Sequence, residues 1–258
     1  MDGSEETGAR VRQIARDVLA MPTWRRVSAQ VWPRRLALSA IAALAGLLYA
    51  WVMGQDTLEY YYAAADRSMS MSWHNFIFGA FDPAGTSTVD KLPGALWIQA
   101  LSVRAFGLHT WAIILPQVIE GILTVLVLYR AVTRLAGPAA GLIAALVLAV
   151  SPATVALDRE NISDSLLILL LVLAADAVSG AIAGLAAGDA GQDAGTLGRL
   201  ILAGFWVGLA FQAKEIEAWM VLPALGLAYL LSGPARCCGG PAGSRSRVWS
   251  SRWCRCPG

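Results

Sequence analysis

Long apolar blocks restrict the fold of this chain more than any other feature of its sequence. The first block runs from Leu36 to Gly54, and it is bracketed by Trp32 and Trp51, which lie 19 residues apart. Nineteen helical residues extend about 28 Å, close to the ~30 Å hydrocarbon thickness of a bilayer. Tryptophan is enriched at both membrane interfaces. The block therefore predicts an uncleaved membrane-spanning helix.

Five further apolar blocks follow, at Ala112–Val132, Ala139–Leu157, Ser165–Ala187, Leu200–Ala213 and Ile216–Ser232. The composition also indicates a membrane protein, since 57% of the 258 residues are hydrophobic and only 15% are charged. A soluble domain is near half apolar with about a quarter of its residues charged. We predict an all-α integral membrane protein with about six transmembrane helices, embedded as a multi-pass protein in the plasma membrane bilayer.

A long connection, Gln55–Thr110, separates the first block from the second. It contains the amphipathic stretch Pro93–Phe106, which is too short to cross a membrane. An amphipathic helix of this kind lies in the interface plane. We expect a long outer loop that contains interfacial helices.

Arginine placement predicts the orientation of the spans. Cytoplasmic loops carry an excess of Lys and Arg. Arginines precede the first block, separate the second from the third and fill the tail: Arg10, Arg12, Arg16, Arg25, Arg26, Arg34, Arg35, Arg130, Arg134, Arg236, Arg245, Arg247, Arg252 and Arg255. Both termini are therefore expected in the cytoplasm. The segments Gln55–Thr110, Asp158–Asp164 and Lys214–Glu217 then face outward.

Three parts are expected along the chain: a basic cytoplasmic leader over 1–35, a membrane domain over 36–232 and a tail over 233–258. After Pro234 the apolar pattern stops, and Arg, Gly, Ser, Pro, Cys and Trp take over. GC-rich codons read out of frame give such a composition, so we expect a truncated or frame-shifted chain. All four cysteines lie in the tail without a histidine, which does not favour a zinc site. The arginine clusters contain no nucleic-acid recognition module, so no nucleic-acid partner is expected.

The outward segments combine carboxylates with cations at the ends of several predicted spans. A carboxylate can take a proton from an acceptor, and cations can stabilise a departing phosphate. A substrate with a phosphate-linked head and a lipid tail would lie at this interface. Two alternatives are a transporter, which would place ionisable groups near the bilayer midplane, and a non-catalytic membrane scaffold.

Several separated motifs resemble one family. They are Tyr61–Ala65, Ser72–Phe76, Phe81–Pro83, Val89–Pro93, Leu96–Trp97, Phe106–Gly107, Leu115–Gln117, Asp158–Asn161 with Asp164, and Phe211–Lys214. In this order they resemble bacterial polyprenyl-phosphate-sugar glycosyltransferases of the GT-C superfamily, which are related to protein O-mannosyltransferases and the lipid A aminoarabinose transferase. The resemblance implies transfer of a sugar from a polyprenyl-phosphate donor to a cell-envelope protein, lipid or glycan at the outer face.

The resemblance also implies roles for individual residues. An acidic residue of the first outer loop is the usual base in this family, and here Glu59, Asp82 and Asp90 all remain open. A Lys-Pro-Pro step helps to hold the donor phosphate; Lys91 matches its lysine, while Leu92 replaces the first proline. The remaining candidates are Arg159 and Lys214 for the donor phosphate, and Asn161 and Asp164 as further site residues. The transfer is metal-assisted or metal-free, so a divalent cation is a possible cofactor.

Overall fold

A computed structural model describes residues 31–51, 53, 58–187 and 193–232. Most of the predicted basic leader and the whole predicted tail, 233–258, lie outside the described residues. The described residues form helices and no strand, apart from one isolated bridge between Ala80 and Thr88. The all-α prediction is confirmed.

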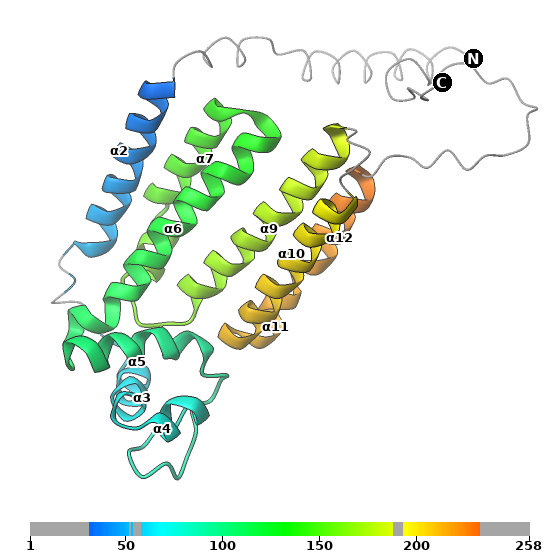
Figure 1. The fold of residues 1–258 in the computed structure, drawn as a ribbon. Coiled ribbons are helices and arrows are strands. Elements are labelled where there is room, and N and C mark those ends of the chain that lie inside the picture. The colour runs from blue at the N-terminus through cyan, green and yellow to red at the C-terminus, as the bar shows by residue number, and fades with distance from the viewer. Residues whose placement is uncertain (1–30, 52, 54–57, 188–192, 233–258) are drawn as a thin grey trace, which may run out of the picture.

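In the described part of the chain, six helices lie side by side in a bundle (Figure 1). They are α2 (Val31–Ala50), α6 (Thr110–Ala136), α7 (Pro138–Val150), α9 (Asp164–Ala187), α10 (Asp193–Ala213) and α12 (Leu222–Ser232). One core cluster joins the first three of them, and its buried members are Ala45, Tyr49, Ile114, Val118, Val125, Ala145 and Ala149. Small residues such as these alanines allow helix backbones to approach closely, as membrane bundles require.

Three of the described helical segments are each long and apolar enough to cross a membrane: Thr110–Ala136, Asp164–Gly184 and Gly195–Ala213. Pro138–Ala149 is a shorter apolar helix. These helices confirm a membrane protein, while the number of spans and the sides of the termini remain predictions.

Two of the predicted spans are interrupted. The block Ala139–Leu157 divides at Ser151 into α7 and α8 (Pro152–Leu157). Proline disfavours helical geometry in the residue before it, and Ser151 is accordingly extended, with φ −63° and ψ 123°. The block Ile216–Ser232 divides into α11 (Glu215–Trp219) and α12. The apolar pattern alone did not reveal either break.

The outer loop folds into α3 (Tyr60–Met71), α4 (Trp73–Phe78) and α5 (Gly94–Phe106). The Ser72 hydroxyl caps α4 by accepting from the backbone N–H groups of His74 (3.1 Å) and Asn75 (3.4 Å). Helix α5 confirms the helix predicted at Pro93–Phe106. It lies across one end of the bundle, and α3 and α4 lie beyond it (Figure 1). A separate core joins α3 to α5 and includes Ala65, Met69, Val89, Leu96 and Ala100.

This arrangement gives a direct test of orientation. Ser87 is exposed in the outer loop, and Ala136 is exposed where α6 ends at the opposite end of the bundle. With the four native cysteines replaced by serine, Ser87→Cys should react with a membrane-impermeant maleimide in intact cells. Ala136→Cys should react only after permeabilisation. Labelling of Ala136→Cys but not Ser87→Cys in intact cells would reverse the orientation.

Candidate functional site

Lys91 lies just before α5, half-buried beside Tyr62 of α3. Its ammonium group donates a 2.5 Å hydrogen bond to the Tyr62 hydroxyl and lies 5.0 Å from the centre of the Tyr62 ring. Among the described residues, no carboxylate lies within 4.0 Å of this ammonium group. The hydrogen bond to Tyr62 raises the pKa of Lys91 above its ordinary value, so the ammonium form persists at neutral pH.

Asp90, the residue before Lys91, is positioned by Tyr61, the residue before Tyr62. The Asp90 backbone N–H donates to the Tyr61 hydroxyl at 3.0 Å, and the Asp90 side chain is exposed. Tyr61 itself stacks on Phe81, with ring centroids 4.7 Å apart. Two consecutive tyrosines of α3 thus position two consecutive residues of the outer loop, and they leave the Asp90 carboxylate facing solvent.

Lys214 forms the second charged group, at the junction of α10 and α11. Its ammonium group lies 2.8 Å from Asp164 Oδ1, at the start of α9, and 3.7 Å from Glu217 Oε1. The Lys214 and Asp164 side chains are 21% and 27% exposed, so the pair is largely shielded from water. Asp164 partly neutralises Lys214 and ties α9 to α10.

A close backbone contact brings the two charged groups to the same end of the bundle. A Cβ atom at Gly94 would lie only 2.6 Å from the Gln212 carbonyl oxygen, so only glycine allows α5 to start this close to the end of α10. Attraction from Asp164 is also among the causes that raise the pKa of Lys91. The sequence contains two lysines among its 20 basic residues, and both lie here.

Asn161 and Glu59 form a different kind of contact. The fully buried Asn161 side chain accepts from the Glu59 N–H (2.6 Å) and donates to the Glu59 carbonyl (3.1 Å). Asn161 thereby fastens the start of α3 to the connection between α8 and α9. The Glu59 carboxylate is not used in this contact, and the Glu59 side chain is exposed.

Asp82 closes its own loop. Its Oδ1 atom accepts from the backbone N–H groups of Thr86 and Ser87, each at 2.9 Å, and from the Ser87 hydroxyl at 3.2 Å. These hydrogen bonds, with that from the Ser87 backbone the largest cause, lower the pKa of Asp82. A carboxylate with a lowered pKa is a weaker base.

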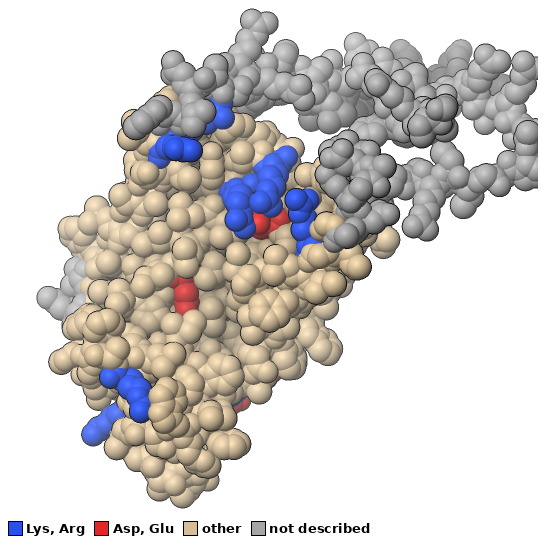
Figure 2. Space-filling model, viewed as in Figure 1, with Lys and Arg blue, Asp and Glu red and all other residues tan. Residues whose placement is uncertain are grey.

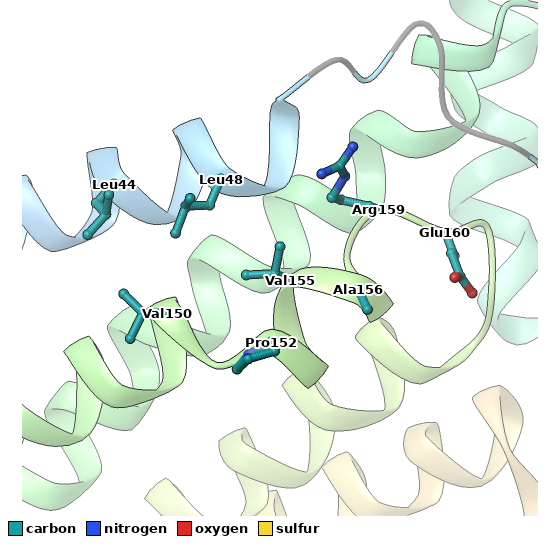
Figure 3. A pocket seen from close by; sticks show the side chains of 8 residues that line it. All are labelled: Leu44, Leu48, Val150, Pro152, Val155, Ala156, Arg159 and Glu160. Atoms are coloured by element: carbon teal, nitrogen blue, oxygen red, sulfur yellow. The ribbon is translucent and has the colours of Figure 1, made fainter.

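Arg159 lies in a separate pocket of about 710 Å³, which neither lysine lines. The pocket is bounded by α2, the end of α7 and α8, and its lining is mostly apolar: Leu44, Leu48, Val150, Pro152, Val155 and Ala156, with Arg159 and Glu160 (Figure 3). Arg159 and Glu160 point in opposite directions from the connection between α8 and α9 (Figure 3). Lys91 and Lys214 thus lie near the contact between α5 and α10, whereas Arg159 lines a different pocket.

Two buried carboxyl groups, Asp66 and Asp158, were given no role from the sequence, although Asp158 begins one of the matching motifs. Asp66 on α3 is fully buried, and neither of its oxygens has a hydrogen-bond partner among the described residues. Burial raises the pKa of Asp66 well above its ordinary value and raises that of Asp158 to about 6. The burial of Asp158 depends on Gly121, 37 residues earlier, which leaves room for its carboxylate.

Within the described part of the chain, no group of three or more His, Cys, Asp or Glu side chains is arranged to hold a metal ion. An exposed carboxylate such as that of Asp90 is the type of ligand that would hold a Mg²⁺ ion.

Comparison with known proteins identifies the family. Residues 90–238 match the family described as dolichyl-phosphate-mannose-protein mannosyltransferase. The chain belongs to this family. It is 42% identical over 197 residues to "Putative mannosyltransferase YycA" of Bacillus subtilis (strain 168), which covers 76% of this chain and 27% of that protein. It is 41% identical over 180 residues to "Putative mannosyltransferase YkcB" of the same organism, covering 70% and 24%.

The chain therefore spans about a quarter of the length of these relatives. No solved structure matches it. The resemblance drawn from the separated motifs of the chain is confirmed, and the matched family is one of membrane glycosyltransferases.

The Gly94 contact can be tested by one methyl group. Alanine normally stabilises a helix relative to glycine by up to about 1 kcal/mol. Gly94→Ala should instead lower the melting temperature of the detergent-purified chain, because the new Cβ collides with the Gln212 backbone. Gly204→Ala, on α10, is the matched control and should be neutral or stabilising, because outside its chain neighbours and the backbone of its own helix no described atom lies within 4 Å of the new Cβ. Equal melting temperatures for the two variants would contradict the close approach of α5 and α10.

Proposed function

We propose that this chain forms the donor-phosphate end of a membrane glycosyltransferase that takes a sugar from a polyprenyl-phosphate donor at the outer face of the plasma membrane. The environment of the Lys91 ammonium group is the main support for this function. Its ammonium group is half-buried and positioned by the Tyr62 hydroxyl, with no carboxylate within ion-pairing distance among the described residues. An anion can therefore contact this charge without first displacing an acidic partner.

Phosphate suits this position for two reasons. Lysine is a compact point charge that commonly binds phosphate oxygens. Lys91 also lies three residues before Gly94, where α5 begins, and the N-terminal N–H groups of a helix favour an anion. Lys214 adds a second cation close by, although Asp164 neutralises part of its charge.

Asp90 is the carboxylate best suited to act as the base. In the proposed step, the sugar C1–phosphate oxygen bond breaks and a bond forms from C1 to the acceptor oxygen. The acceptor proton passes to a carboxylate, and polyprenyl phosphate leaves with the bonding electron pair. Asp90 is exposed next to Lys91, whereas the Asp82 Oδ1 atom already accepts three hydrogen bonds. Glu59 is the second choice, because its carboxylate is also exposed.

The acceptor is proposed to be a protein, lipid or glycan of the cell envelope. The proposal keeps residues 36–232 as one membrane domain, with both termini in the cytoplasm. Membership of the mannosyltransferase family supports this function over a transporter or a scaffold.

Substitution of Lys91 tests the donor site. We expect Lys91→Ala to reduce sugar transfer from polyprenyl-phosphate mannose about a hundredfold, as for other lost charge contacts in catalytic sites. Binding of polyprenyl phosphate to the purified chain should weaken about tenfold or more, since a hydrogen bond to a charged group contributes ~1.5–3 kcal/mol. The binding measurement does not require that this chain alone be active. Arg104→Ala, on the exposed face of α5, removes a cation elsewhere and should leave both quantities unchanged.

Two further variants separate the roles. Tyr62→Phe removes the positioning hydroxyl but keeps the ammonium group, so its effect should be smaller than that of Lys91→Ala. Asp90→Asn should abolish transfer while leaving polyprenyl-phosphate binding within about threefold of the parent. The donor-site proposal is wrong if Lys91→Ala binds polyprenyl phosphate within about threefold of the parent, a difference below ~1 kcal/mol. Normal transfer by Asp90→Asn would instead remove only the base assignment.

A further inference from the structure

The end of the bundle opposite the lysines carries a second charged group, which the proposed function does not use. Arg130 and Arg134 lie near the end of α6, and both contact Asp176 of α9. Arg130 binds the Asp176 carboxylate through Nε (3.1 Å) and Nη2 (2.5 Å), and Arg134 binds it through Nη1 (2.9 Å). Asp176 is buried, while the side chains of Arg130 and Arg134 are 54% and 36% exposed.

A third arginine joins this group without an acidic partner of its own among the described residues. Arg199 of α10 is exposed and donates a hydrogen bond to the Gly180 carbonyl. A Cβ atom at Gly180 would lie 3.2 Å from Arg134 Nη1 and 3.3 Å from Arg199 Cδ, so Gly180 separates two neighbouring arginine side chains. Figure 2 shows basic side chains gathered around acidic atoms on this part of the surface.

Charge balance indicates what this arginine cluster, Arg130, Arg134 and Arg199, can bind. The cluster contains three guanidinium groups, two of which contact the Asp176 carboxylate, so with Asp176 it has a net charge of +2. A single arginine paired with Asp176 would be enough to link α6 to α9, so the other arginines are not needed for that link. Neighbouring guanidinium groups repel each other, and a further anion between them would relieve this repulsion.

Position identifies the source of the anion. Arg134 is in the last turn of α6, about 36 Å along that helix from Thr110, and α7 begins its return at Pro138. This distance exceeds the ~30 Å hydrocarbon thickness, so the guanidinium groups reach the level of the lipid headgroups. Basic pockets between helices at this level bind anionic headgroups. A guanidinium group matches the two non-bridging oxygens of a phosphodiester.

We propose that the arginine cluster binds the phosphate of an anionic phospholipid headgroup in the leaflet opposite the lysine site. The lipid phosphate accepts hydrogen bonds from Arg199 and from the exposed parts of Arg130 and Arg134, while Asp176 holds the last two in place. The lipid thus stabilises the junction of α6, α9 and α10.

Native mass spectrometry of the full chain in detergent tests this site. The probes are phosphatidylglycerol, phosphatidylcholine with the same acyl chains, and inorganic phosphate. We expect phosphatidylglycerol to bind at least tenfold more tightly than phosphatidylcholine, and inorganic phosphate not to displace it at millimolar concentration. Arg199→Gln leaves the ion pairs to Asp176 intact and should weaken phosphatidylglycerol binding about fivefold, the contribution expected for one basic residue near an anionic surface.

Two control variants complete the design. Arg199→Lys retains the charge and should retain most of the binding. Arg104→Gln removes an exposed cation at the other end of the bundle and should have no effect. Equal binding of the two phospholipids, or equal affinities for Arg199→Gln and Arg104→Gln, would overturn the site. Displacement of phosphatidylglycerol by millimolar inorganic phosphate would show a soluble-anion site and overturn the lipid assignment.

Discussion

The contact between Gly94 and the Gln212 backbone determines how the outer loop meets the bundle. It fixes the start of α5 against the end of α10, and Lys91 and Lys214 lie within three residues of the two contacting positions. The Asn161 side chain makes the second attachment, through both backbone groups of Glu59. With α3 and α5 fixed in this way, the hydroxyls of Tyr61 and Tyr62 can reach Asp90 and Lys91.

The two ends of the bundle carry different chemistry. The end covered by α5 has both lysines of the chain together with Asp90 and Asp164. The opposite end has arginines around the buried Asp176. A charge inside a membrane segment is costly unless it is paired, and the bidentate Arg130 contact satisfies Asp176. Lysine, by comparison, offers a compact charge that a tyrosine can position and a phosphate can contact.

The sequence predicted the features that depend on composition over many residues. Apolar blocks located the bundle helices, and the amphipathic stretch Pro93–Phe106 became α5. The sequence did not predict the features that depend on contacts between distant segments. Tyr62 is 29 residues from Lys91, and Asp176 is more than 40 residues from its two arginines. For the same reason, the contact of the Asn161 side chain with the Glu59 backbone could not be predicted from the sequence. Pro152 was a local signal for the break between α7 and α8, but the continuous apolar pattern around it obscured that signal.

Lys91 and Lys214 share one end of the bundle, and the composition of the chain makes this arrangement directly measurable. Because the sequence has only these two lysines, a short, membrane-impermeant, amine-reactive cross-linker has few possible targets. Applied to intact cells, it should give an intramolecular Lys91–Lys214 link, identified by mass spectrometry after digestion. Single modification of both lysines with no link between them would contradict this arrangement of the two side chains.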